Sequence, residues 1–379
     1  MESMATTNSD VLEDKILKSA ITDDALNVDS RLLKLKRQEI LELSCFERLR
    51  WMYLMRVQHK ELNRLMSDLQ ELLKPDIDVN IISVIGMTGA GKTTLANGLR
   101  TNLKEAVFGM VPKCEQPVLL VKAPANGDKS FSWKSLYHRI LAEAEEPLPY
   151  AKRGVLMDAG YMAISLNARK GLDPLRLAIE SMLKNRNVRV LVIDEVLHLL
   201  RFGNYSAVMD TLKSLADSYS TKLILVGAYN LAELMQDYGQ VAKRSEILHY
   251  RRYHFGVDED KEEFFRVLEV MQNLWPCREV PDLSIVGELL MKANLGCIGL
   301  LKGSLMRLAS LQMAAKNEKF SSAFLKKAVK SKKLLSVIEA EVLAGEAELV
   351  GATYGESVFA DQAQQALLNA LEASVRSEA

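Results

Sequence analysis

The segment from Gly86 to Thr93 combines glycines with a Lys-Thr pair at a spacing that suits phosphate binding. It fits the pattern G-x-x-x-x-G-K-[ST] at every fixed position. Glycines let backbone N–H groups converge on phosphate oxygens without a Cβ clash. Lys92 has the length to reach the β and γ phosphates of ATP, and the Thr93 hydroxyl can ligate Mg²⁺. The residues predicted to hold ATP are Gly86, Met87, Thr88, Gly89, Ala90, Gly91, Lys92, Thr93 and Thr94.

Two adjacent carboxylates, Asp194 and Glu195, follow the apolar run of residues 190–193. Ligands of open α/β sheets bind at the carboxyl ends of the strands, and a buried strand here would carry both acids to that edge. Asp194 is predicted to hold ATP and to join Thr93 around Mg²⁺, while Glu195 orients and deprotonates the attacking water. Such a pair favours hydrolysis over transfer to a substrate hydroxyl. The alternative is a strand with a solvated acidic end.

Two further polar residues are candidates for catalysis. Asn230 follows the apolar run 223–227 and could contact the γ-phosphate or the water, although a plain turn-forming asparagine is an equal alternative. Arg244 closes the segment Gln-Val-Ala-Lys-Arg at 240–244. An arginine there could stabilise transition-state charge on a neighbouring protomer's nucleotide, as an arginine finger does. The alternative is a solvated basic turn.

Short apolar, β-branched runs alternate with helical patterns around these residues. Such alternation predicts an α/β fold, a parallel sheet flanked by helices. Predicted strands cover 79–86, 118–121, 188–194 and 222–227, and predicted helices cover 132–143, 172–185 and 206–219.

The rest of the chain is predicted to be helical or flexible. Apolar residues at helical spacing suggest one or two amphipathic helices before Pro75, which either pack on the next domain or dock a partner. The helical pattern from Asp258 to Lys333 suggests a lid-like domain. The predicted divisions are an acidic flexible leader (1–30), a helical extension (31–75), the α/β core (76–257), a helical lid (258–335) and an acidic tail (336–379).

Charge is balanced in sum but segregated along the chain. The 379 residues carry 49 Lys+Arg and 49 Asp+Glu, which excludes a uniformly basic coat for nucleic acid. Residues 1–30 have a net charge of −5, residues 31–75 of +4, residues 316–333 of +6, and residues 339–379 of −7. A local basic surface therefore remains possible.

Cysteine use and hydropathy indicate a cytoplasmic protein. The four cysteines lie far apart without a C-x-x-C spacing, which argues against a disulfide framework or a zinc site. The N-terminal residues lack the pattern of a secretory signal, and no apolar stretch is long enough to span a membrane.

The motifs together resemble AAA+ transposition regulators of the TnsC/TniB family. The resemblance rests on GMTGAGKTT, LVIDEVLHLL, ILVGAYNLAEL and GQVAKRSEILHYRRYHF, and it extends to ANLGCIGLLKGSLMRLA and KKLLSVIEAEVLAGEAEL. It implies an AAA+ core that binds ATP and assembles on double-stranded DNA as a ring or helical filament. A member of a Tn-seven-like or CRISPR-associated transposon would pass a signal from a targeting protein to the transposase.

The resemblance also implies DNA contacts after the second strand, where Lys122, Lys129 and Lys134 are the matching positions. These contacts would be sequence-blind and salt-sensitive, and the alternative for each is a solvated surface lysine. Two positions depart from the family pattern, Ala228 in place of a threonine and Lys243 in place of an arginine. A cationic sensor on the lid is not obvious, and Lys302 and Arg307 are both candidates.

Other function classes remain open on the residues alone. A remodelling or STAND-like signalling ATPase could act on protein partners without DNA, and a nucleotide-gated scaffold could bind ATP and scarcely hydrolyse it. Residues 1–75 are expected to dock the targeting partner, and the acidic tail beyond Glu339 is expected to reach the transposase or nuclease.

Overall fold

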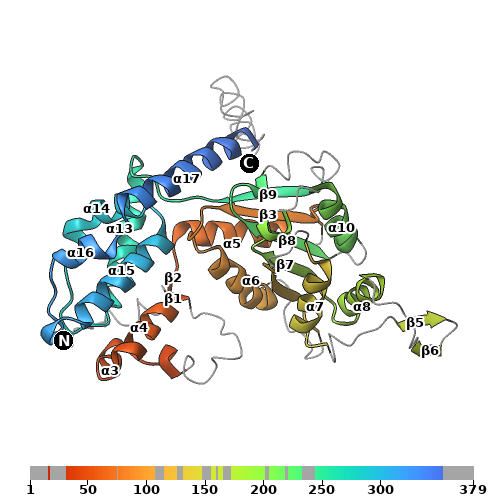
Figure 1. The fold of residues 1–379 in the computed structure, drawn as a ribbon, viewed down its shortest axis with the longest axis horizontal. Helices are drawn as coiled ribbons and strands as arrows, with labels where there is room; N and C mark the ends of the chain where they lie inside the picture. Colours follow the sequence, from red (N-terminus) through yellow and green to blue (C-terminus); the bar gives the residue numbers. More distant parts are fainter. Residues whose placement is uncertain are drawn as a thin grey trace, which may run out of the picture.

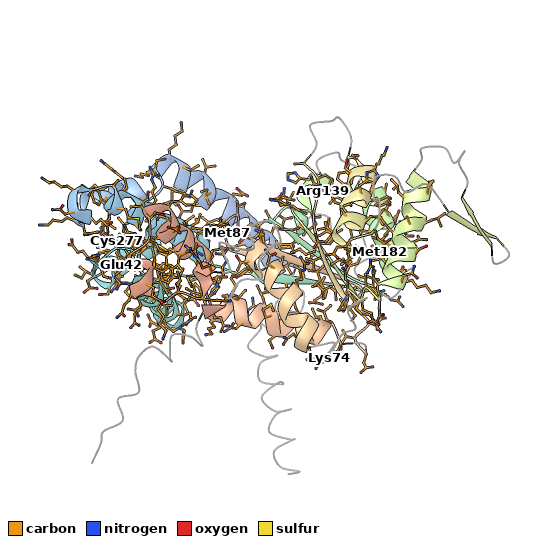
Figure 2. All side chains as sticks on the ribbon, turned by 90° about the horizontal axis from the view of Figure 1, so that it is seen from below. Glu42, Lys74, Met87, Arg139, Met182 and Cys277 are labelled. Atoms are coloured by element: carbon orange, nitrogen blue, oxygen red, sulfur yellow. The ribbon has the colours of Figure 1, made fainter. Side chains whose placement is uncertain are left out.

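The computed structural model describes residues 16–17, 31–74, 76–106, 115–125, 131–146, 155–158, 161–164, 172–200, 205–217, 221–232 and 244–352. Two lobes lie side by side, one built on a sheet and one built from helices (Figure 1). Figure 2 shows the same layout from another side, with Cys277 in the helical lobe, Met182 in the sheet lobe and Met87 where they meet. Most of the predicted leader, Lys129 and the last residues of the predicted tail lie outside the described part.

A five-stranded sheet forms the centre of the first lobe. Its order is β4-β7-β8-β3-β9 and every pairing is parallel. All positions of β3 and β7 are buried, which matches their mainly apolar sequence; Ser83 and Asp194 are the polar exceptions. The strands are β3 (Ile81–Gly86), β4 (Val118–Lys122), β7 (Val190–Asp194), β8 (Lys222–Gly227) and β9 (Ser245–Tyr250). The predicted fold class, a parallel sheet flanked by helices, is confirmed.

Helices cover both faces of this sheet (Figure 1). Helix α5 (Lys60–Leu72) packs on the sheet because Leu62, Leu65 and Leu69 recur at helical spacing. These side chains are buried in the core shared with the sheet. The helices of this lobe are α5 (Lys60–Leu72), α6 (Lys92–Ala106), α7 (Trp133–Glu143), α8 (Leu172–Asn185), α9 (Leu197–Leu200) and α10 (Tyr205–Asp217). An antiparallel hairpin that the sequence did not predict, β5 (Val155–Asp158) with β6 (Tyr161–Ile164), lies at the far end.

The second lobe is helical and has its own apolar core. Trp51 and Met52 of the N-terminal segment are buried in that core beside Trp275 and Leu305. Arg37 Nε donates to the Trp275 carbonyl over 2.8 Å. Its elements are α3 (Arg37–Ile40), α4 (Cys45–Leu54), β2 (Arg56–Val57), α13 (Asp258–Asn273), η2 (Ser284–Val286), α14 (Gly287–Ala293), α15 (Ile298–Met313), η3 (Lys316–Glu318) and α16 (Ala323–Ala328). Strand β2 also pairs with β1 (Ile16–Leu17).

The segment 31–75, predicted as one extension, is therefore shared between the lobes. Residues up to Val57 belong to the helical core, while α5 belongs to the sheet core. The division follows from the burial of Trp51 in one core and of Leu65 in the other. Packing against neighbouring domains, one of the two predicted roles of these helices, is what the structure shows.

Helix α17 (Lys332–Ala352) joins the lobes and runs across the boundary predicted at residue 335. Val342 and Leu349 are 2% exposed and belong to the sheet core. Arg252 holds Glu346 through two hydrogen bonds of 2.8 and 2.9 Å. The first part of the predicted acidic tail is thus packed on the core. None of the described helices combines the length and apolar character that a membrane span requires.

Candidate nucleotide-binding site

A cavity of about 630 Å³ lies at the carboxyl ends of the sheet strands. It is formed between the predicted phosphate loop, the ends of β7 and β8, helix α15 and the segment that joins α4 to β2. The residues that line it are Tyr53, Arg56, Thr88, Gly89, Gly91, Lys92, Thr93, Thr94, Asp194, Glu195, Leu197, His198, Val226, Gly227, Ala228, Gly299, Lys302, Gly303 and Met306. Most of the residues predicted to bind the nucleotide therefore line this one cavity.

The backbone of the loop explains its glycines. Gly89 and Gly91 have φ values of +86° and +105°, which only glycine adopts without strain. A Cβ at Gly86 would lie 2.7 Å from the Tyr250 carbonyl oxygen, so β9 could not approach the loop if any other residue stood there. The loop leads directly into α6, and a helix N-terminus attracts anions.

Lys92 points back onto the loop. Its Nζ donates to the Gly86 carbonyl over 2.7 Å and to the Met87 carbonyl over 2.8 Å. Burial lowers the pKa of Lys92 to about 8, although the charge of Asp194 opposes that shift. A polyphosphate in the cavity would compensate the desolvation of this amino group.

Thr93 and Asp194 meet as predicted for a metal site. The Thr93 hydroxyl donates to Asp194 Oδ2 over 2.8 Å, and Oδ1 of the same carboxylate accepts the Glu195 N–H over 2.8 Å. A hydroxyl and a carboxylate are hard oxygen donors of the kind that Mg²⁺ prefers beside substrate phosphates. The residues present therefore fit Mg²⁺-ATP.

Glu195, the predicted base, is held by two neighbours. Its Oε1 lies 2.8 Å from Lys122 Nζ and its Oε2 lies 3.3 Å from His198 Nε2. The hydrogen bond that Lys122 donates to Glu195 raises the pKa of Lys122. Glu195 also has a φ of 57°, a strained conformation for a non-glycine residue. Strain beside a nucleotide cavity accords with the predicted functional role of this position.

Seven of the predicted residues within the described ranges do not line this cavity: Gly86, Met87, Ala90, Lys122, Lys134, Asn230 and Arg244. Asn230 is exposed beyond it, because a turn closed by the Leu231 N–H to the Ala228 carbonyl leaves Ala228 at the wall. Arg244 stands at the amino end of β9, at the opposite edge of the sheet, and its Nε lies 3.3 Å from Asp78 Oδ2. Lys134 is exposed in the first turn of α7.

Residues from the helical lobe line the cavity without a sequence prediction for them. Lys302, predicted only as one of two sensor candidates, donates to the carbonyls of Tyr53 and Met55 over 2.6 and 2.5 Å. Burial and the nearby charge of Arg56 lower its pKa to about 6. The spacing of Gly299 and Gly303, one helical turn apart, was an available signal of close approach. A Cβ at Gly299 would lie 1.7 Å from the Gly89 carbonyl oxygen.

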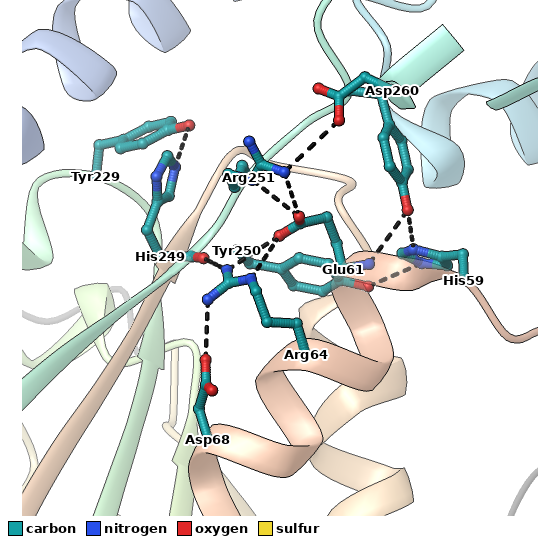
Figure 3. A network of polar contacts seen from close by, with 10 residues as sticks. His59, Glu61, Arg64, Asp68, Tyr229, His249, Tyr250, Arg251 and Asp260 are labelled. Carbon is teal, nitrogen blue, oxygen red and sulfur yellow. Dashed lines mark hydrogen bonds and ion pairs between the residues drawn. The ribbon is translucent and has the colours of Figure 1, made fainter. Parts of the chain in front are cut away.

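A buried polar network lies behind the phosphate loop (Figure 3). The Tyr250 hydroxyl, beside Gly91, is 3.2 Å from His59 Nε2, and His59 Nδ1 is 2.9 Å from the Tyr253 hydroxyl. The Tyr253 hydroxyl in turn accepts the Glu61 N–H over 3.2 Å. The network ties helix α5 and strand β9 to the chain that enters the helical lobe.

A buried carboxylate completes this network. Glu61 accepts from Arg251 at 2.7 and 2.8 Å and from Arg64 at 3.0 and 3.1 Å. Burial would raise the pKa of Glu61, but the two guanidinium groups outweigh it and lower the pKa. Two cations on one buried acid keep it ionised and fix the start of α5.

The buried His59 leads us to expect that the protein becomes less stable as the pH falls. Burial lowers its pKa from 6.5 to about 4, so the unfolded chain binds more protons than the native one between these values. The free energy of unfolding should fall as the pH drops through this window, by about 1.4 kcal/mol per unit at most. Between pH 7 and 5, wild type should lose about 2 kcal/mol more than His59→Gln in denaturant titrations. Parallel pH profiles for the two proteins would contradict the assignment.

Comparisons with known proteins identify the domain that carries the cavity. Residues 78–235 match the family model of the AAA domain. A search of curated proteins gives no significant match. Solved structures share the fold at low identity. The Aeropyrum pernix Orc1 protein in complex with DNA is 16% identical, with a TM-score of 0.50 over 77% of this chain and 68% of that one.

Two other solved structures are comparable in extent. The Walker-type ATPase PABY2304 of Pyrococcus abyssi is 15% identical, with a TM-score of 0.42 over 77% of this chain and 75% of that one. Domain III of the Thermotoga maritima replication initiation protein DnaA is 16% identical, with a TM-score of 0.40 over 71% of this chain and 93% of that one. The family match indicates an AAA+ ATPase domain at residues 78–235, and ATPases of this class use ATP with Mg²⁺.

Proposed function

We propose that the protein is an ATP-dependent, sequence-nonspecific double-stranded-DNA-binding ATPase that oligomerises on DNA. In this proposal it links target-site selection to the transposase in DNA transposition. The AAA domain and the Mg²⁺-ATP geometry support the nucleotide part. The resemblance of the motifs to the TnsC/TniB family supports the DNA and transposition part.

The observation that carries the proposal is the ion pair between Lys122 and Glu195. A residue proposed to contact DNA lies 2.8 Å from the residue proposed to activate water. The pairing follows from the sheet, because Lys122 is aligned with Asp194 at the ends of the adjacent strands β4 and β7. The side chain of Lys122 is 59% exposed, so a phosphate can reach it.

DNA would therefore influence ATP hydrolysis because its phosphates and the Glu195 carboxylate compete for the ammonium group of Lys122. A DNA phosphate that attracts Lys122 would leave Glu195 free to accept a proton from water. Lys129 and Lys134 would add further phosphate contacts. Hydrolysis would follow assembly on DNA and would then favour release.

Arg244 would serve a neighbouring protomer. It stands at the sheet edge opposite its own nucleotide, so its guanidinium can meet a nucleotide only in another copy of the chain. Lys92, Thr93, Asp194 and Glu195 of one protomer and Arg244 of the next would then form a complete site in a ring or helical filament. Asn230 would have to move to act on the γ-phosphate, and we assign it no role in the resting state.

Duplex binding with and without ATP tests the proposal. Labelled duplexes of several unrelated sequences would be titrated over about 50 to 200 mM salt, with a non-hydrolysable ATP analogue to hold the assembly. We expect similar affinities for all sequences, a steep salt dependence and a requirement for nucleotide. Absence of binding at low salt with nucleotide would refute the DNA function and favour an ATPase that acts on protein partners alone.

Lys122→Ala should uncouple hydrolysis from DNA. Without the ammonium group, Glu195 loses its 2.8 Å partner in the absence of DNA and keeps only the 3.3 Å contact with His198. We expect the basal ATPase rate to rise by about tenfold, since releasing a charge-assisted hydrogen bond changes the barrier by ~1–2 kcal/mol. Stimulation by DNA should largely disappear. Lys134→Ala, remote from the cavity, is the matched control and should keep low basal activity; an unchanged DNA response in Lys122→Ala would contradict the coupling.

A further inference from the structure

The helical lobe carries a cluster of lysines between residues 316 and 333, which we call the lid lysine surface. It runs through η3, α16 and the start of α17, all far from the sheet (Figure 1). Six of its lysines are exposed and Lys330 is half-buried. The lid lysine surface comprises Lys316, Lys319, Lys326, Lys327, Lys330, Lys332 and Lys333.

No acidic group of the segment neutralises this surface. Glu318 is the one acid between residues 316 and 333, and it turns inward to Arg48. Its Oε2 accepts from Arg48 Nη1 over 3.0 Å, and its Oε1 accepts from Nη2. Among the described residues, none of the seven lysines forms an ion pair. Their charge is therefore available to a partner.

Helix stability does not account for the placement of these lysines. Ser331 precedes α17, and the Leu335 N–H donates to its carbonyl over 2.9 Å. Lys332 and Lys333 thus stand in the first turn of a 21-residue helix without an acid beside them. Cations at a helix N-terminus oppose the helix dipole and cost about 0.3–1 kcal/mol each.

We propose that the lid lysine surface binds the phosphate backbone of duplex DNA, as a second contact besides the residues at the end of β4. This inference rests on the proposed DNA function. Lysine side chains are flexible point charges. A surface that holds lysines and no arginines suits phosphate contacts that do not depend on the base sequence. Interfaces with proteins are instead depleted in lysine and enriched in aromatic residues and arginine.

The position of the surface supports an extended partner. In Figure 1 helix α16, which carries part of the lid lysine surface, lies at one end of the molecule, and helix α7, which carries Lys134, lies in the other lobe. A DNA duplex is long enough to contact both lobes of one protomer, or lobes of successive protomers in an assembly. Repetition in an assembly would join these local surfaces into a continuous basic track.

A triple substitution at the start of α17 tests the proposal. Lys330→Gln/Lys332→Gln/Lys333→Gln removes three charges without removing buried apolar groups. At about 0.1 M salt the affinity for duplex DNA should fall roughly tenfold for each lysine that contacts a phosphate, and the log–log salt slope should fall by about 1 per contact. The midpoint of thermal unfolding should stay or rise, because the opposing helix dipole is relieved. Lys326→Gln/Lys327→Gln on α16 should weaken binding in the same direction.

The matched control carries the same loss of charge elsewhere. Lys60→Gln/Lys184→Gln/Lys213→Gln changes three lysines of the sheet lobe and should leave the salt slope close to that of wild type. Equal affinities for wild type and the α17 variant would overturn the lid contact while leaving the proposed function intact. Equal losses in the α17 variant and the control would overturn it as well, since net charge alone would then explain binding. If wild type with nucleotide binds no duplex, the proposed function itself fails.

Discussion

Glu195→Gln is expected to slow ATP hydrolysis by about 10²–10⁴-fold, the usual contribution of a positioned general base. Glutamine has the same shape but cannot accept a proton from water at neutral pH. The Glu195 N–H bond to Asp194 involves the backbone and should persist, so the metal ligands stay in place. Affinity for Mg²⁺-ATP should therefore change little. Phosphate release at saturating ATP and equilibrium titration with a fluorescent nucleotide separate the two quantities.

The same variant should accumulate DNA-bound assemblies. If hydrolysis favours release, the complex with ATP will persist much longer in Glu195→Gln than in wild type, as dilution-chase measurements would show. Lys122→Gln is the informative control, because it breaks the same ion pair and leaves the carboxylate. Normal hydrolysis in Glu195→Gln would mean that Glu195 is not the base.

Local patterns were enough to predict most of the loop residues that line the cavity. The turn between β3 and α6 needs glycines at φ values near +90°, and the adjoining Lys-Thr pair follows within one helical turn. The acid that ends β7 lies at the ligand-binding edge because all five strands are parallel. Spacing within some ten residues determines these features, so the sequence reveals them without knowledge of the tertiary fold.

Contacts between distant segments could not be predicted in this way. Lys302 reaches Tyr53 across 249 positions of the chain, and Gly299 touches the loop at Gly89. The proximity of Lys122 and Glu195 depends on β4 and β7 being neighbours, which strand order decides and hydrophobic pattern does not. Charge counting likewise described the end of the chain as an acidic tail. It could not show that Glu346 pairs with Arg252.

The two lobes meet directly at the phosphate loop, and this contact suggests how nucleotide could influence a DNA contact on the lid. The Cys297 thiol donates to the Gly89 carbonyl over 3.3 Å, and α15 begins at the next residue. Helix α15 packs on α16, which carries part of the lid lysine surface. A change of the loop on ATP binding would therefore be transmitted to α15 and from there to the lysines. If the protein binds DNA as proposed, this route would link nucleotide binding to DNA affinity through one connected set of contacts.

Lys92→Ala should reduce affinity for Mg²⁺-ATP by about 10²-fold or more, since loss of one partner from a buried charge pair costs ~2–5 kcal/mol. The native fold should tolerate the change, because burial already lowers the pKa of Lys92 to about 8 and its desolvation is unfavourable without phosphate. Nucleotide titration measures the loss, and thermal unfolding without nucleotide checks the fold.

Assembly on DNA should disappear together with nucleotide binding in this variant. Electron microscopy or light scattering with duplex DNA and ATP would follow it, with Lys60→Ala as a control lysine outside the cavity. Residual binding at low salt through the lid lysine surface should remain, because those seven side chains do not contact the nucleotide cavity. Lys92→Ala should thus separate weak, nucleotide-independent contact from ordered assembly. Undiminished rings or filaments in this variant would contradict an ATP-controlled switch.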